Sequence, residues 1–158
     1  MEQAGARGTR PGRGRILVVC YGNICRSPIA EVLLKERLQE AGMGKLYSVR
    51  SAGVGALPGT PAAPGTVQAA RRRGLALEGH RARRLTPEMA READVLIALD
   101  EVVEEEIGIL AGDDLPVLLW PVDDPYGGPE AGYARALDEI EAHVRRFVES
   151  RAGSGRHD

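Results

Sequence analysis

Short apolar runs alternate along the chain with longer segments in which apolar and polar residues are mixed. The runs are rich in Val, Ile and Leu and are bounded by turn-forming residues, which is typical of buried parallel strands. They predict four strands, at residues 16–20, 47–51, 95–99 and 117–120. The mixed segments carry helix start and stop signals. They predict helices at residues 28–41, 64–73 and 101–110, another that opens at residues 86–88, and a closing helix near the carboxyl end.

The closing helix has the clearest periodicity. Its apolar side chains recur at spacings of four and three residues, which places them on one helical face. These residues are Tyr133, Leu137, Ile140, Val144 and Phe147. We expect this face, including its aromatic rings, to pack into the core rather than to bind a ligand.

The alternation of strands and helices predicts an α/β fold, a single three-layer domain in which helices flank both faces of a four-stranded parallel sheet. A chain of 158 residues with 43% hydrophobic residues can bury one such core. The domain is predicted to span residues 15–152. Residues 1–14 and 153–158 are rich in Gly, Arg and Ser and are expected to be disordered. In such folds ligands bind outside the carboxyl ends of the strands.

The candidate chemistry follows the first predicted strand. Cys20 ends this strand, and Ser27-Pro28 reads as a helix opening with a serine cap and a first-turn proline. A loop between a strand end and a helix start collects unpaired N–H groups that favour an anion. Five residues separate Cys20 from Arg26, enough for the loop to curl around one tetrahedral anion while the guanidinium binds two of its oxygens. The pattern predicts a phosphate site with a cysteine nucleophile.

The rest of the loop supports this interpretation. Gly22 lets the backbone turn inward, and Asn23 tolerates a left-handed backbone and can bond back to the loop. The Ser27 hydroxyl can cap the helix and donate to a departing thiolate. The candidate phosphate-binding residues are Tyr21, Gly22, Asn23, Ile24, Cys25, Arg26 and Ser27.

Residues 20–28 resemble the phosphate-binding loop of the low-molecular-weight protein tyrosine phosphatases, and residues 123–127 resemble their acid loop. Residues 51–53 and 80–83 are similar to further family segments, so the resemblance extends over residues 15–149. It implies four parallel strands in the order 2-1-3-4. It also implies hydrolysis through a phosphocysteine intermediate, without a cofactor or metal.

The resemblance also implies roles for individual residues. Cys20 would be the nucleophile, Arg26 would bind phosphate, and Asp124 would be the general acid. Asp124 is preferred to Asp123 because it directly precedes Pro125, as the family motif requires. The implied hydrogen-bond network that holds the loop consists of Asn23, Ser51 and His80.

Three residues near these motifs have competing interpretations. His80 could be a base or a metal ligand, but it has no second ligand at suitable spacing and is expected to be structural. Asp100 is expected to cap the following helix. Cys25 is either a small buried side chain or the thiol that captures oxidised Cys20 as a disulfide.

The substrate remains open between phosphotyrosine and phosphoarginine. The candidate pocket residues are Ile24, Leu57 and Tyr126, whose apolar surfaces suit a phenyl ring. The resemblance extends to a protein arginine phosphatase branch, which typically has threonine where this chain has Ile24. Residues 54–58 lack the aromatic residue of many tyrosine-specific members. Phosphotyrosine is preferred because of Ile24.

Composition narrows the partners and the setting. A formal net charge of −2 argues against general nucleic-acid binding, and the arginine clusters at residues 71–73 and 81–84 are expected to be solvated faces. An arsenate reductase would need a further cysteine pair besides Cys20 and Cys25. We expect a cytoplasmic, monomeric enzyme that acts on phosphorylated proteins or peptides, because the sequence has no signal peptide and no long apolar segment.

Overall fold

The computed structural model describes residues 14–156. Its centre is the predicted parallel four-stranded sheet, in the order β2-β1-β3-β4 that the family resemblance implied. The strands are β1 (Gly14–Cys20), β2 (Tyr47–Gly53), β3 (Val95–Ala98) and β4 (Leu118–Leu119). The helices are α2 (Arg26–Glu40), α3 (Pro64–Arg72), α4 (Pro87–Glu92), α5 (Glu101–Ala111) and α6 (Glu130–Arg156).

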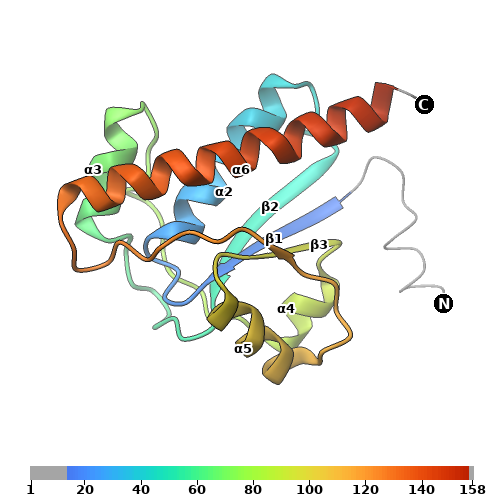
Figure 1. Cartoon of the computed structure of the whole chain (residues 1–158), viewed down its shortest axis with the longest axis horizontal. Helices are drawn as coiled ribbons and strands as arrows, with labels where there is room; N and C mark the ends of the chain where they lie inside the picture. Colours follow the sequence, from blue (N-terminus) through green and yellow to red (C-terminus); the bar gives the residue numbers. More distant parts are fainter. Residues whose placement is uncertain (1–13, 157–158) are drawn as a thin grey trace.

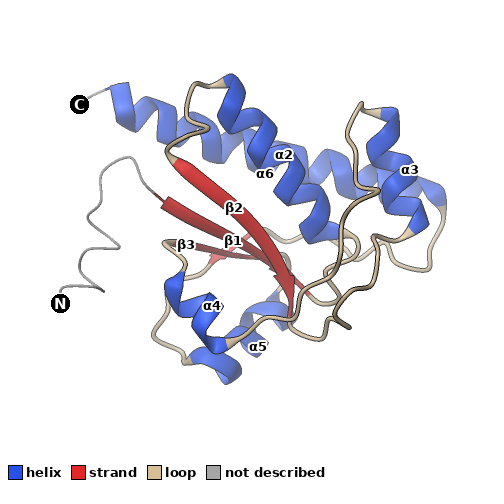
Figure 2. Cartoon of the chain, turned by 180° about the vertical axis from the view of Figure 1, so that it is seen from behind, coloured by secondary structure: helices blue, strands red, loops and turns tan. Residues whose placement is uncertain are grey.

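The helices form two layers on opposite faces of the sheet. Helices α2, α3 and α6 cover one face, and α4 and α5 cover the other (Figures 1 and 2). Each layer packs against alternate side chains of β1: Ile16 and Val18 face the first, whereas Leu17 and Val19 face the second. The strand is apolar on both faces because it is covered on both, which explains the continuous apolar run in the sequence.

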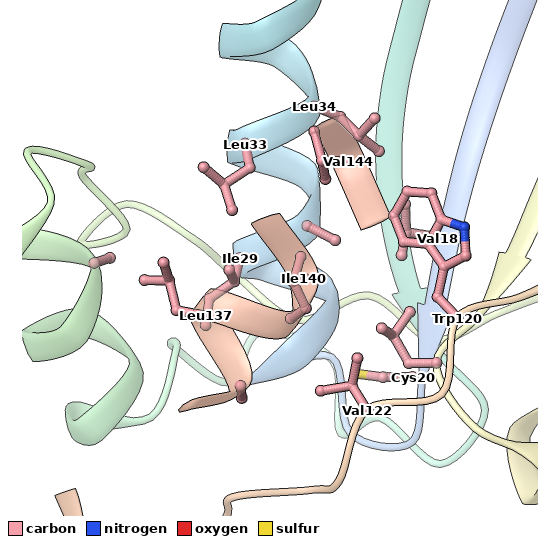
Figure 3. Packing of buried hydrophobic residues seen from close by; sticks show 14 of the residues in the cluster. Val18, Cys20, Ile29, Leu33, Leu34, Trp120, Val122, Leu137, Ile140 and Val144 are labelled. Atoms are coloured by element: carbon pink, nitrogen blue, oxygen red, sulfur yellow. The ribbon is translucent and has the colours of Figure 1, made fainter. Parts of the chain in front are cut away.

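The larger core lies between β1, α2 and α6. In Figure 3, apolar side chains of α2 and α6 meet beside the strands. The predicted face of the closing helix is buried, as Tyr133, Leu137, Ile140, Val144 and Phe147 are all at most 7% exposed. These aromatic rings therefore belong to the core, as predicted.

The arginines at residues 71–73 form ion pairs with acidic side chains. Arg72 contacts Glu130, and Arg73 contacts Asp138 and Glu141. These ion pairs connect the carboxyl end of α3, including the residue Arg73 that follows it, to α6. Within residues 14–156, no helix is long and apolar enough to cross a lipid bilayer.

Several element boundaries differ from the predicted ones. Helix α2 begins at Arg26 rather than Pro28, so Ser27 is its second residue and not its cap. Strand β4 has only two residues, because Pro116 and Pro121 flank this edge strand and neither can donate a backbone hydrogen bond.

The ends of the domain also differ. Gly14 belongs to β1, where it pairs with Tyr47. Helix α6 continues to Arg156 instead of ending before Gly153, and its last turns are held where Arg151 lies over the Phe147 ring and Ala152 packs on the core. The rest of the predicted disordered ends, residues 1–13 and 157–158, lies outside the described residues.

The strand order brings the predicted site residues to one edge of the sheet. The chain turns from β1 to β2 on one side and returns to β3 on the other side of β1. The loops after β1 and β3 therefore lead to helices on opposite faces, and a crevice opens between them. Cys20 ends β1 at this crevice, and Asp100 follows β3 there.

Candidate active site

The loop between β1 and α2 turns its carbonyl groups outward. The carbonyl oxygens of Cys20, Tyr21 and Ile24 accept hydrogen bonds from Val54, Gly55 and Ala63, respectively, at 2.9–3.1 Å. The N–H groups of the loop take no part in these bonds. The Asn23 N–H donates to the Cys20 Sγ at 3.2 Å. Such an arrangement of backbone donors at the start of a helix forms an anion-binding cradle.

Two backbone features allow the loop to close this tightly. Asn23 has a φ of 56°, in the left-handed region that asparagine tolerates better than most residues. Gly53, at the end of β2, lies against the loop, and a Cβ there would come within 2.5 Å of the Tyr21 carbonyl oxygen. A side chain at residue 53 would therefore push the loop away from the sheet.

The fully buried Asn23 side chain holds the loop together. Its Nδ2 donates to Ser27 Oγ at 2.8 Å and to Ser51 Oγ at 3.0 Å, while its Oδ1 accepts from the Arg83 N–H at 2.8 Å. The Asn23 carbonyl lies 2.7 Å from His80 Nε2. The structure thus brings Asn23, Ser51 and His80 together.

Ser51 has a second partner that the sequence did not reveal. Its hydroxyl donates to Glu31 Oε1 at 2.5 Å, and Glu31 also contacts Lys35. Glu31 looks like an ordinary exposed helix residue in the sequence, because it forms an i,i+4 pair with Lys35. Only the packing of α2 on β2 reveals its contact with the network.

Cys20 and Ser27 are in direct contact. The Ser27 Oγ lies 2.9 Å from the Cys20 Sγ, and both residues are buried. Because Ser27 Oγ accepts from Asn23, its own hydrogen is free to point at the sulfur. The helix start has Cys25 at the N-cap with no side-chain capping bond, so the first N–H groups of α2 are left for an anion.

The Arg26 guanidinium is buried, and hydrogen bonds to Asp100 and to the Val122 carbonyl hold it in place. Its Nη1 donates to Asp100 Oδ2 at 2.8 Å and to the Val122 carbonyl at 2.9 Å. Its Nε has no hydrogen-bond partner within the described part of the chain. Nε and Nη2 share one edge of a guanidinium, so this edge can bind two oxygens of one anion.

Asp100 contributes more than the helix cap that the sequence predicted. Its Oδ1 accepts from the Val103 N–H at 2.8 Å, which is the capping bond, while Oδ2 holds Arg26. Burial acts to raise the pKa of Asp100, but the hydrogen bonds from Arg26 and from the start of α5 outweigh it and place the pKa below its ordinary value. Asp100 is therefore a stable anion that orients Arg26.

Asp124 lies at the mouth of the site. Its Oδ2 is 3.8 Å from Arg26 Nη2, and its Oδ1 accepts from the Tyr126 N–H at 3.1 Å. The side chain is 49% exposed, so it can meet both a leaving group and water. Asp123 is exposed and does not line the cavity.

A cavity of about 380 Å³ opens above the loop. The predicted pocket residues Ile24, Leu57 and Tyr126 all line it, together with Cys20, Tyr21, Gly22, Cys25, Arg26, Gly55, Thr60 and Asp124. Tyr21 was predicted to bind phosphate, but its role as a pocket wall was not predicted. The positions of Gly55 and Thr60 at the cavity were not predicted either, because a strand–loop pattern does not show which loop residues face a cavity.

Cys25 is buried at the start of α2 and also borders the cavity. Burial raises the pKa of its thiol to about 11, although the Thr66 hydroxyl opposes the shift. At neutral pH the Cys25 side chain is therefore a thiol.

Residues 15–154 match the family model described as low molecular weight phosphotyrosine protein phosphatase. The chain is 44% identical over 142 residues to the probable low molecular weight protein-tyrosine-phosphatase EpsP of Ralstonia nicotianae, covering 84% of this chain and 92% of that protein. Among solved structures it resembles the tyrosine phosphatase Wzb of Escherichia coli K30, with a TM-score of 0.80 and 32% identity over 87% of this chain and 98% of that one. It also resembles the YwlE arginine phosphatase of Geobacillus stearothermophilus, with a TM-score of 0.80 and 29% identity over 91% and 96% of the two chains.

Proposed function

The chain belongs to the low molecular weight phosphotyrosine protein phosphatase family, and we propose that it hydrolyses phosphotyrosine in proteins, with Cys20 as nucleophile, Arg26 as phosphate ligand and Asp124 as general acid. The observation that carries this proposal is the cavity in which these three residues meet beside apolar walls. We place the enzyme in the cytoplasm as a monomer, a setting that suits its two free thiols.

In the first step, the Cys20 thiolate attacks phosphorus and a sulfur–phosphorus bond forms. The bond from phosphorus to the tyrosyl oxygen breaks, and Asp124 in its acid form gives a proton to that oxygen. The phenol leaves, and the enzyme holds a phosphocysteine. The location of Asp124 at the exposed mouth suits a proton donor to a group that departs toward solvent.

In the second step, a water molecule attacks the phosphorus of the phosphocysteine, and the Asp124 carboxylate takes a proton from this water. The sulfur–phosphorus bond breaks, inorganic phosphate forms, and Cys20 leaves as a thiolate. The Ser27 hydroxyl, 2.9 Å from the sulfur, donates to the negative charge that returns there.

Arg26 binds the phosphoryl oxygens in both steps. Asp100 and Val122 occupy its Nη1, so the edge formed by Nε and Nη2 is available for two equatorial oxygens. Because Asp100 fixes the guanidinium before substrate arrives, little reorganisation is needed as charge develops on these oxygens. The loop N–H groups supply the remaining donors.

The alternative substrate is phosphoarginine, which the structural likeness to an arginine phosphatase supports. Ile24 distinguishes the two because its side chain borders the cavity and cannot form a hydrogen bond with a guanidinium. We expect the wild-type enzyme to prefer a phosphotyrosine peptide over a matched phosphoarginine peptide. We expect Ile24→Thr to shift the kcat/KM ratio toward phosphoarginine by about 1 to 3 kcal/mol. Steady-state kinetics on both peptides measure the ratio.

The matched control is Ile24→Val, which shortens the side chain but adds no hydroxyl group. If polarity at residue 24 sets the preference, Ile24→Val should have nearly the same ratio of kcat/KM values for the two peptides as the wild type, whereas Ile24→Thr should not. A wild-type enzyme that hydrolyses phosphoarginine more efficiently than phosphotyrosine would replace the first function with the second.

We further propose that oxidation switches the enzyme off reversibly. Peroxide oxidises the Cys20 thiolate to a sulfenic acid. The Cys25 thiol then loses its proton and its sulfur attacks the sulfenic sulfur; the S–S bond forms, the S–O bond breaks, and the hydroxyl group leaves with the proton as water. We expect mild peroxide to give a Cys20–Cys25 disulfide by mass spectrometry and an activity that dithiothreitol restores. Because the pKa of Cys25 is raised to about 11, its thiolate fraction and the rate of capture increase as pH rises toward that value.

Cys25→Ala is the control for this reaction. Without the second thiol, peroxide should drive Cys20 to sulfinic and sulfonic acids, and dithiothreitol should no longer restore activity. Irreversible oxidation of Cys20 in the wild-type protein, with Cys25 still free, would instead identify Cys25 as a small buried core residue.

A further inference from the structure

The Tyr21 ring rests on a glycine. A Cβ built on Gly55 would lie 2.6 Å from Cζ, 2.7 Å from Cε2 and 2.8 Å from Oη of Tyr21, closer than real side chains approach. The Gly55 N–H also donates to the Tyr21 carbonyl at 2.9 Å, so the backbones of the two residues are fixed side by side. Gly55 does not have a positive φ, so its backbone conformation does not require glycine. The absence of a side chain at residue 55 instead makes room for the ring.

The ring is still open to the cavity on another side. Tyr21 is 55% exposed although its tip lies against Gly55, and both residues border the cavity above Cys20. Tyr126, on the loop that carries Asp124, borders the same cavity and is 64% exposed. Two aromatic side chains from separate loops thus stand exposed around the place where a substrate must enter.

We propose that Tyr21 is a specificity-determining residue: its ring forms the aromatic wall that contacts the phenyl group of the substrate, and Gly55 keeps the space in which this wall stands. The proposal rests on the proposed phosphotyrosine hydrolysis. It assigns to a side chain of the phosphate loop the aromatic contact that residues 54–58 do not supply, since that segment contains no aromatic residue.

The physical reason is the quadrupole and rigidity of an aromatic ring. Tyrosine offers a large flat surface with only two side-chain torsions, and aromatic pairs gain energy beyond their buried area. A ring seated on Gly55 loses still more freedom before substrate binds, so less entropy is lost in the complex. A phosphorylated alcohol such as phosphoserine has no ring and gains nothing from this wall.

The test is a double-mutant cycle on Tyr21 and Gly55. The four proteins are wild type, Tyr21→Ala, Gly55→Ala and the double variant, and Tyr21→Phe is added to keep the ring without its hydroxyl. For each, the ratio of kcat/KM on a phosphotyrosine peptide to kcat/KM on acetyl phosphate, which has no ring, is measured. The Ki for inorganic phosphate, measured in parallel, reports on the phosphate loop itself.

We expect Tyr21→Ala to lower the ratio by about 3- to 10-fold, mainly through KM of the phosphotyrosine peptide, and Tyr21→Phe to keep it. Gly55→Ala should lower the ratio in the wild-type background, because the new Cβ displaces the ring. In the Tyr21→Ala background the same Gly55→Ala change should have no effect on the ratio.

An equal effect of Gly55→Ala with and without the Tyr21 ring would overturn the proposal, as would an unchanged ratio in Tyr21→Ala. A loss in Tyr21→Phe as large as in Tyr21→Ala would also overturn it, since the hydroxyl would then be the important group. Each of these results would leave phosphotyrosine hydrolysis intact. Failure of the wild-type enzyme to hydrolyse phosphotyrosine peptides would reject the proposed function itself.

Discussion

Cys20→Ser is expected to abolish turnover while the protein still binds inorganic phosphate. Serine is close in size to cysteine, so the loop should keep its carbonyl groups turned outward, and its N–H groups and the free edge of Arg26 remain available to the anion. Among the described residues, the side chain at this position contacts Ser27 Oγ and the Asn23 N–H, neither of which is a general base, and a hydroxyl group is a far weaker nucleophile than a thiolate. We expect kcat to fall by about 10⁴-fold or more, the order seen when an enzyme loses its nucleophile.

Two measurements check this result. Turnover of a phosphotyrosine peptide reports on chemistry, and equilibrium dialysis with radiolabelled phosphate reports on the intact site. Phosphate binding without turnover is the expected pair of results. Steady turnover by purified Cys20→Ser would mean that another group is the nucleophile.

The fold was predictable because the pattern of apolar residues in this sequence follows the burial of each element. Strand β1 is covered on both faces, so its side chains are uniformly apolar, whereas α6 is covered on one face and shows a helical period. Boundaries were less predictable where two signals competed. The Ser27-Pro28 pair resembles a helix start, yet the backbone is already helical at Arg26, and the Ser27 hydroxyl contacts Cys20 and Asn23 instead of capping the helix.

The residues within the phosphate loop were predictable because they are contiguous, and their spacing alone implies an anion cradle. The residues that orient the loop were partly hidden. Asp100 is 74 positions from Arg26, and a single sequence shows only that Asp100 precedes a helix. Its second role arises because β1 and β3 are neighbours, so the residues after both strands meet at the same edge. The Tyr21 side chain was missed for a similar reason, since its seat is a glycine on another loop.

Asp124→Asn is expected to slow hydrolysis of substrates with poor leaving groups by about 10² to 10⁴, because asparagine cannot give a proton to the departing oxygen. With an activated aryl phosphate, whose leaving group departs without a proton, the rate of phosphocysteine formation should fall much less. Asparagine keeps the size of the side chain and an oxygen that can accept from the Tyr126 N–H, so the loop should keep its shape. Rates on a series of aryl phosphates with rising leaving-group pKa measure the difference.

Asp123→Asn is the matched control, since it removes one carboxylate from the adjacent position without touching the cavity. Asp124 lies 3.8 Å from the guanidinium that binds the phosphoryl group, whereas Asp123 does not border the site. The dependence on the leaving group should therefore steepen only in Asp124→Asn, because a missing acid matters more as the departing oxygen becomes more basic. If Asp123→Asn showed the steeper dependence, the proton donor would be Asp123. The acid loop would then have to change its conformation during the reaction to bring Asp123 to the cavity.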